Sequence, residues 1–212
     1  MKKLAIFDID FTITKKETFI QLFIYSIKKD IKNIKYIPRA IYSGVMYGLG
    51  FFDEKAVKEC FIKFLVNKDE STLKRFVRDF YKDVLSKILY KDSIDMIKKL
   101  KKEGCDVYFI SASGEFYLKE LYAIKEVDMI IGTRFEFKDG IFTGKMIGKN
   151  CKGEEKVHRL KEVLHKKNIE VDFKNSYMFS DSLSDKPLLD LVGNPYLINY
   201  KKKTNMKVLN WK

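Results

Sequence analysis

The chain has 212 residues, of which 46% are hydrophobic and 14% aromatic, enough for one domain with a buried core and a sizeable insertion. Its formal net charge is +13, from 42 Lys and Arg against 29 Asp and Glu. That charge suits an anionic partner, but the lysines are spread over many predicted helices and no nucleic-acid motif is present, so we expect no nucleic-acid partner.

The amino-terminal residues and the cysteines bear on the compartment. Met1, Lys2 and Lys3 lead directly into a short apolar run that is too brief for a secretory signal. The cysteines are scattered, with no CxxC pair, which favours free thiols over a cysteine metal site. We therefore expect a cytoplasmic protein.

The first predicted element is a strand formed by the apolar run Leu4–Phe7, which leads into Asp8 and Asp10. A short apolar run bounded by polar residues is typical of a strand that is buried on both faces of a parallel sheet. Residues i and i+2 of a strand share a side, so two carboxylates placed there repel each other unless a cation intervenes. Taken alone, the pair fits a metal site, a shared proton or a solvated acidic turn.

The segment from Glu17 to about Leu89 carries only helical patterns, which predicts an all-helical insertion. One of its helices begins near Asp53, a plausible N-cap residue. The stretch Tyr36–Phe52 is apolar and aromatic, but it is near or below the length that spans a bilayer. We expect this stretch to be buried in the insertion, with a membrane-facing surface as the alternative.

Strands and helices alternate after about residue 91, which predicts a Rossmann-like parallel sheet. Strands are predicted at 105–110, 127–131, 176–179 and 196–198, with a hairpin at 135–143 and a basic tail after the last strand. The expected architecture is an α/β core formed by residues 1–14 and 91–212, with residues 15–90 as a helical cap domain.

Three predicted strands end in polar clusters, namely Asp8 with Asp10, Ser111 with Ser113, and Asp181 with Asp185. The carboxyl ends of parallel strands meet at one edge of a sheet, where ligands bind. Carboxylate oxygens suit Mg²⁺, a carboxylate can attack phosphorus, and a second carboxylate can act as acid and base. The alternative interpretation is that Ser111 and Asp181 only cap the helices that follow them.

Lys156 lies in the first turn of a predicted helix, where a positive charge is mildly unfavourable. An anionic partner such as Asp8 together with a phosphoryl group would explain its position. The alternative is a solvent-exposed lysine, one among many.

Four motifs, in order along the chain, resemble those of the haloacid dehalogenase (HAD) superfamily of phosphohydrolases. They are Asp8-Ile-Asp10-Phe-Thr12, Ser111-Ala112-Ser113, Lys-Gly-Glu-Glu-Lys156, and Ser180-Asp181-Ser-Leu-Ser-Asp185. More narrowly, the chain resembles subfamily IB and its phosphoserine-phosphatase-like branch, in which a helical C1 cap follows the first strand. The resemblance covers nearly the whole chain.

The resemblance implies a role for each matched residue. Asp8 is implied as the nucleophile and Asp10 as the acid and base, with Mg²⁺ as cofactor. The remaining implied roles are Asp8, Asp10 and Asp181 as metal ligands, Ser111, Ala112, Lys156 and Thr12 in phosphate binding and loop support, and Asp185 as a supporting residue. Glu17 stands where phosphoserine phosphatases carry an acidic substrate-contacting residue, and its alternative is a residue favoured at a helix start.

Three positions depart from that pattern. Phe11 stands where a small residue usually follows the second Asp, and a positive φ is costly there without Gly. Ser180 replaces the Gly that usually precedes Asp181. Lys58 and Glu59 occupy the region in which phosphoserine phosphatases carry an Arg that holds the substrate carboxylate, which argues against serine phosphate as substrate.

The sequence thus predicts a Mg²⁺-dependent phosphomonoesterase that hydrolyses a small phosphorylated metabolite through an aspartyl-phosphate intermediate. One alternative is a phospholipid headgroup phosphatase at the membrane surface. A second alternative is a non-catalytic phosphate- or nucleic-acid-binding module. The physiological substrate and the oligomeric state are not readable from the sequence.

Overall fold

The fold is built on a seven-stranded sheet, and the computed structural model describes all of residues 1–212. The strand order is β4-β3-β2-β1-β5-β6-β7, and every neighbouring pair is parallel except β3 with β4. This arrangement confirms the predicted Rossmann-like sheet. The strands are β1 (Lys3–Phe7), β2 (Cys105–Gly114), β3 (Val127–Lys138), β4 (Ile141–Ile147), β5 (Tyr177–Ser180), β6 (Asn194–Ile198) and β7 (Lys207–Leu209).

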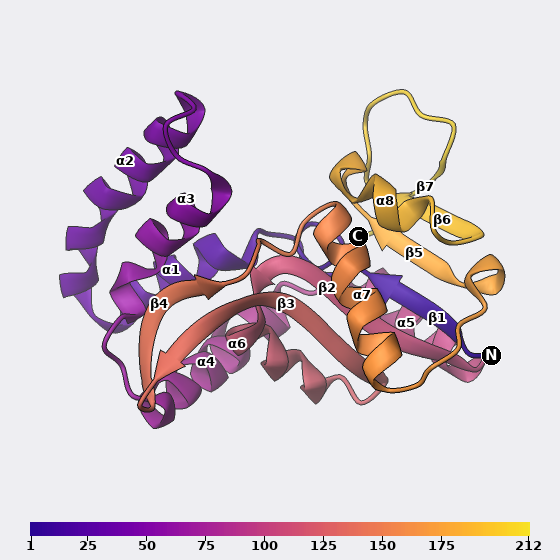
Figure 1. The fold of residues 1–212 in the computed structure, drawn as a ribbon, viewed down its shortest axis with the longest axis horizontal. Helices are drawn as coiled ribbons and strands as arrows, with labels where there is room; N and C mark the ends of the chain where they lie inside the picture. Colours follow the sequence, from indigo (N-terminus) through magenta and orange to yellow (C-terminus); the bar gives the residue numbers. More distant parts are fainter.

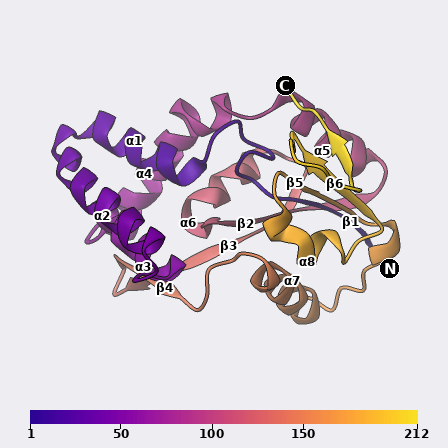
Figure 2. The same ribbon diagram turned by 90° about the horizontal axis from the view of Figure 1, so that it is seen from above.

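Four helices gather at one end of the molecule, and the others lie along the sheet (Figures 1 and 2). The first group is α1 (Thr18–Lys29), α2 (Ile37–Gly48), α3 (Glu54–Phe61) and α4 (Glu70–Asp83), with 3₁₀ turns η1 (Ile31–Tyr36) and η2 (Ile62–Leu65) between them. The second group is α5 (Lys91–Lys102), α6 (Glu115–Leu118), α7 (Glu154–Lys166) and α8 (Lys186–Leu189). No helix is long and apolar enough to cross a membrane.

The central strand β1 is apolar throughout because both of its faces are covered. Leu4 and Ile6 belong to a cluster of 14 buried residues on the face that α7 and α8 cover. Ala5 and Phe7 belong to a cluster of 32 buried residues on the opposite face, which also includes residues of α5. Side chains alternate between the faces of a strand, so a strand at the centre of a three-layer fold needs apolar residues at every position.

The larger cluster also contains residues of the helices that follow β1. Phe23 of α1 and Phe80 of α4 belong to it together with Tyr117 of α6. The hairpin of β3 and β4 reaches the same helices, because Asn67 donates a backbone hydrogen bond to Phe142 and Phe142 donates one to Lys68. The helical segment is therefore packed on the sheet through one continuous core. The division at residues 15–90 stays a prediction.

Three expectations about local structure are wrong. β3 is one long strand from Val127 to Lys138, which joins the predicted short strand to the first arm of the hairpin. The predicted basic tail contains β7, a three-residue edge strand whose pairing with β6 depends on contacts far along the chain. Most of Tyr36–Phe52 is not buried, because in α2 only Ser43 is buried while Ile41 and Val45 are more than half exposed.

Candidate active site

Asp8 is the first residue after β1, and its carboxylate is held by Lys156. Lys156 Nζ lies 2.7 Å from Asp8 Oδ1 and 2.6 Å from Asp185 Oδ2. All three residues are buried, with Lys156 only 2% exposed. The predicted meeting of a first-turn lysine with Asp8 is therefore present in the structure.

The charges of this cluster do not balance. Burial lowers the pKa of the Lys156 ammonium, but the carboxylates of Asp8 and Asp185 outweigh it and raise that pKa above its usual range. For Asp8, burial together with Asp185 and Asp10 outweighs Lys156 and raises the pKa to about 8. Burial and the charge of Asp185 raise the pKa of Asp181 to about 6. Several carboxylates thus share one buried ammonium, an excess of negative charge that a cation would relieve.

Asp10 is fixed between the N-terminus of α1 and the end of β2. Its Oδ1 accepts a hydrogen bond of 2.6 Å from the backbone N–H of Thr18. Its Oδ2 accepts one of 2.7 Å from the hydroxyl of Ser113. The role of Ser113 was missed, although its spacing of two from Ser111 in an extended segment could have indicated that both lie on one side.

Glu17 is the N-cap residue of α1. Its Oε2 accepts a hydrogen bond from the backbone N–H of Ile20, as expected of an acidic residue at a helix start. Burial and the charge of Asp10 raise its pKa to about 7. Glu17 also lines the cavity around the strand ends, and its contact with substrate stays a prediction.

The loop after β5 is tied to the loop after β1. The hydroxyl of Thr12 accepts a 2.8 Å hydrogen bond from the backbone N–H of Asp181. Ser180, which stands in the place of the usual Gly, donates its hydroxyl to Asp185 Oδ2 at 2.8 Å. Thr12 is fully buried and does not line the cavity, so its contact supports the loop.

The strand ends surround a cavity of about 400 Å³. The predicted residues that line it are Asp8, Asp10, Glu17, Ser111, Ala112, Lys156, Asp181 and Asp185, and the others are Phe11, Lys152 and Ser184. The hydroxyl of Ser111 accepts a 3.0 Å hydrogen bond from the backbone N–H of Ser113, within the last residues of β2. The predicted site residues, except Thr12 beneath them, therefore converge on one space.

Phe11 takes a backbone conformation that is unfavourable for a side chain. Its φ is +56°, in the left-handed region, and its ring is 46% exposed at the cavity. Such a conformation for a bulky residue is rare and strained, and strain of this kind clusters at functional sites. Phe11, which replaces the usual small residue of the first motif, therefore forms part of the cavity wall in a strained backbone conformation.

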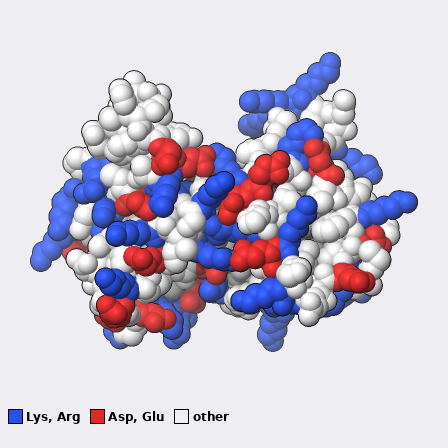
Figure 3. Space-filling model, in the orientation of Figure 1, with Lys and Arg blue, Asp and Glu red and all other residues white.

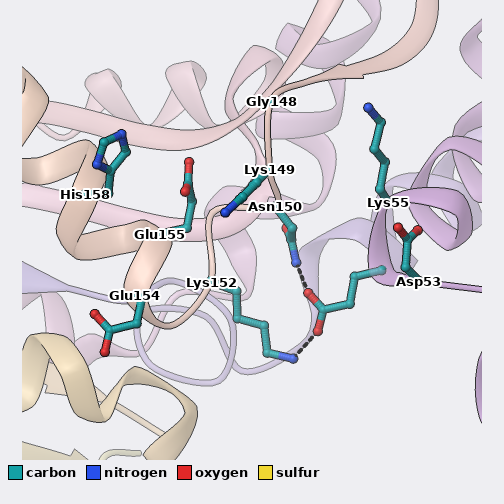
Figure 4. Close-up of a pocket in the computed structure, with 10 residues that line it drawn as sticks. Asp53, Lys55, Gly148, Lys149, Asn150, Lys152, Glu154, Glu155 and His158 are labelled. Atoms are coloured by element: carbon teal, nitrogen blue, oxygen red, sulfur yellow. Dashed lines mark hydrogen bonds and ion pairs between the residues drawn. The ribbon is translucent and has the colours of Figure 1, made fainter.

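A second group of polar side chains joins α3 to the loop that precedes α7 (Figure 4). Asn150 and Lys152 both donate to the carboxylate of Glu54, and dashed lines from their side chains mark the two contacts in Figure 4. Lys152 lines the 400 Å³ cavity and two neighbouring cavities of about 320 and 900 Å³. The active-site cavity therefore lies beside two further cavities along α3, and we call the three together the cleft.

Lys58 of α3 links the same loop to the end of β2. Its ammonium donates to the carbonyl oxygen of Ala112 and, at 2.7 Å, to Oδ1 of Asn150. Burial lowers its pKa to about 8, although Asp10 and Glu54 act in the opposite direction. In the sequence Lys58 stands out only as a departure from the family pattern, and no local pattern indicates Asn150. Arg159 donates a 2.6 Å hydrogen bond to the carbonyl oxygen of Lys149, the residue before Asn150.

The residues present fit a magnesium ion. No cluster of three or more His, Cys, Asp or Glu side chains is arranged to hold a metal. The expected donor set is smaller, with the carboxylates of Asp8 and Asp181 and the main-chain carbonyl of Asp10. Mg²⁺ is commonly bound by one or two carboxylates and keeps several waters, and the uncompensated carboxylates of this cavity suit it.

Comparisons with known proteins agree with this geometry. The family model of haloacid dehalogenase-like hydrolases matches residues 5–190. A histidinol-phosphatase of Neisseria meningitidis serogroup C is 28% identical over 204 residues, which cover 94% of this chain and 91% of that protein.

Two solved structures share the fold. A protein of unknown function from Bordetella pertussis Tohama I superposes with a TM-score of 0.84 at 23% identity, covering 95% of this chain and 92% of that one. A substrate-bound phosphoserine phosphatase superposes with a TM-score of 0.63 at 16% identity, covering 95% and 88%.

The fold and the cavity define an α/β protein with a polar cavity at the carboxyl edge of its parallel sheet. The chain belongs to the haloacid dehalogenase-like hydrolases. As a member of that family it is a hydrolase, of the phosphatase kind that its named relatives represent.

Proposed function

We propose that this protein is a Mg²⁺-dependent phosphomonoesterase that acts on a small phosphorylated metabolite through an aspartyl-phosphate on Asp8. The observation that carries the proposal is the convergence of Asp8, Asp10 and Asp181 with Lys156 on one cavity. Phosphoryl transfer depends chiefly on such positioning and charge neutralisation.

The proposed reaction has two steps. A carboxylate oxygen of Asp8 attacks phosphorus, the ester P–O bond breaks, and Asp10 gives its proton to the leaving oxygen. Asp10 then takes a proton from water, and the resulting hydroxide attacks the phosphorus of the aspartyl-phosphate. Inorganic phosphate leaves and the Asp8 carboxylate is restored.

Each surrounding residue has a defined task in this proposal. Thr18 and Ser113 hold the Asp10 carboxylate in place by their hydrogen bonds. Lys156 orients Asp8 and offers its ammonium to a phosphoryl oxygen, while Ser111 and the Ala112 main chain face the same space. Asp8, the Asp10 carbonyl and Asp181 would hold Mg²⁺, which supplies charge neutralisation at the phosphoryl oxygens.

The size of the site supports a small substrate. A cavity of about 400 Å³ lies within the range of small-ligand sites, and polar residues dominate its wall. The histidinol-phosphatase of Neisseria meningitidis acts on a small phosphate ester, as its name states. A small phosphorylated metabolite is therefore the proposed substrate class.

The test is phosphate release from a broad panel of phosphate monoesters, with Mg²⁺ and with Mg²⁺ chelated. We expect Mg²⁺-dependent release from at least one small monoester, and Asp8→Asn should lower kcat by about a thousandfold or more, since it removes the nucleophile. Asp190→Asn, at an exposed carboxylate outside the cavity, is the matched control and should keep full activity. Full activity in Asp8→Asn, or no release from any monoester, would refute the proposal.

A further inference from the structure

The outer face of α2 is the largest departure from the expected burial. Ile34, Ile41, Val45 and Leu49 are each at least half exposed, and Phe51 is 72% exposed. Ile41, Val45 and Leu49 follow one another at intervals of four residues, which places them on one face of α2 and its C-cap. Ile34 lies in the preceding turn η1, and Phe51 lies just after the helix. Contiguous apolar surface of this kind marks an interaction site, whereas single exposed apolar residues do not. We call Ile34, Ile41, Val45, Leu49 and Phe51 the α2 face.

The α2 face is not an unpacked part of the core. Ile37, one turn before Ile41, and Ala40 pack against the main hydrophobic cluster, and Ser43 is fully buried. Tyr42 makes an edge-to-face contact with Phe52, with 5.9 Å between the ring centroids. The helix is thus anchored on its inner side and presents a second apolar side outward.

The charged residues of the segment that carries the α2 face all have one sign, and the nearest acidic residues in the chain are Asp30 before it and Asp53 after it. No Asp or Glu occurs between Ile31 and Phe52, although the chain contains 29 acidic residues. The charged residues in that stretch are Lys32, Lys35 and Arg39, all of them exposed. In Figure 3 an uncharged area covers the end of the molecule where α2 meets α3. Lys and Arg side chains lie along its outer side, and acidic side chains border it on the side toward the rest of the molecule.

We propose that the α2 face docks on the surface of an anionic lipid bilayer. A helix with exposed apolar residues and flanking cations, and without acidic residues, lies in the interface with its apolar side chains inserted and its cations at the headgroups. At 12 residues α2 is too short to span a bilayer, so it lies on the surface. A second copy of the chain fits less well, because it would bring like charges together.

Docking in this way would bring the substrate cleft close to the lipid surface. Tyr47 of α2 lines the cavity of about 320 Å³ together with Lys58 and Ala112. Ala112 also lines the active-site cavity. The inference about docking stands on the α2 face itself and does not depend on the proposed reaction.

The test is co-sedimentation of the full chain with vesicles of phosphatidylcholine alone or mixed with phosphatidylglycerol. We expect binding to the mixed vesicles that weakens as salt is added and is much weaker with phosphatidylcholine alone. Val45→Asp combined with Leu49→Asp should lower the affinity about tenfold or more, since it places acids in the apolar face. Lys32→Gln combined with Lys35→Gln should weaken binding to mixed vesicles only.

Ile147→Asp, at a site of similar exposure on β4, is the matched control and should bind like the unaltered protein. The Tm and the far-UV circular dichroism spectrum should stay unchanged in all these variants, which shows that they fold. The inference is overturned if the unaltered protein does not bind mixed vesicles, or if Val45→Asp with Leu49→Asp binds them equally well. Self-association that the same double variant abolishes, without vesicle binding, would instead assign the α2 face to a second copy.

Discussion

The ammonium of Lys156 lies 2.7 Å from the carboxylate of Asp8, although 148 residues separate them in the chain. The contact joins the end of the central strand β1 to the first turn of α7. It also places a positive charge beside the proposed nucleophile, where a phosphoryl group would need it. Lys156 contacts Asp185 as well, so its removal would leave two buried carboxylates without their cation.

Replacing Lys156 by Met should therefore destabilise the fold strongly. Breaking a buried ion pair from one side costs roughly 3–5 kcal/mol, because the remaining charge is left uncompensated. Urea unfolding without Mg²⁺ measures the free energy of unfolding. Lys186→Met, which removes an exposed lysine paired with Asp190, is the control and should leave the midpoint unchanged. Equal midpoints for the two variants would contradict the importance of the buried contact.

Magnesium should stabilise the protein more at high pH than at low pH. The folded-state pKa values of Asp8 (about 8) and Asp181 (about 6) lie above the ordinary value of 3.8. Without metal, the folded state therefore binds the protons of these two carboxyl groups more tightly than the unfolded state does. Their contribution to stability is fully present below the ordinary pKa, and it is lost as the pH rises through about 6 for Asp181 and about 8 for Asp8. Mg²⁺ competes with the same protons, so its binding strengthens over that range.

The measurement is the rise in Tm on adding Mg²⁺, at about pH 5 and at about pH 8.5. We expect the larger rise at the higher pH, and Asp181→Asn should remove most of it. A Tm rise that is equal at both pH values, or that persists in Asp181→Asn, would show that Mg²⁺ binds elsewhere.

The strained backbone at Phe11 predicts a difference between two small replacements. Phe11→Gly and Phe11→Ala both remove the ring, but only Gly takes a φ of +56° without a steric cost. The Gly variant should be more stable than the Ala variant by about 1 kcal/mol in urea unfolding. An Ala variant as stable as the Gly variant would mean that the backbone at this position is not strained.

Lys58 should act mainly on substrate affinity. It ties α3 to the Ala112 carbonyl and to Asn150 at the wall of the cleft. Lys58→Met should raise KM for a small phosphate monoester about tenfold with a smaller change in kcat, since hydrogen bonds to a charged group are lost. Lys58→Arg should restore part of the affinity, which a general loss of structure would not allow.

Lys55→Met is the control for that change, because Lys55 is an exposed residue of the same helix. It should leave KM unaltered. Since burial lowers the Lys58 pKa to about 8, KM of the unaltered protein should rise as the pH passes above that value. If Lys58→Met and Lys55→Met had the same KM, a contribution of Lys58 to substrate affinity would be excluded.

Much of the sheet and most of the cavity wall could be predicted from short stretches of sequence. The apolar run Leu4–Phe7 indicates a strand covered on both faces, and Asp8 and Asp10 must then emerge at its carboxyl end. The polar clusters after the next strands lead to the same edge, because parallel strands align their ends. These inferences succeed because they depend on residues that are neighbours in the chain.

The tertiary structure alone decided which side chains complete the site. Lys58 reaches Asn150 across 92 positions, and no local periodicity could indicate that contact. The spacing of Ser113 from Ser111 indicates a shared side, but the hydrogen bond of Ser113 to Asp10, 103 positions away, depends on the pairing of β1 with β2. The exposure of the α2 face could likewise not be predicted from the sequence. An apolar stripe has the same sequence pattern whether a neighbouring helix covers it or leaves it exposed. What lies opposite a side chain depends on how distant segments pack, and that is settled only when the whole chain has folded.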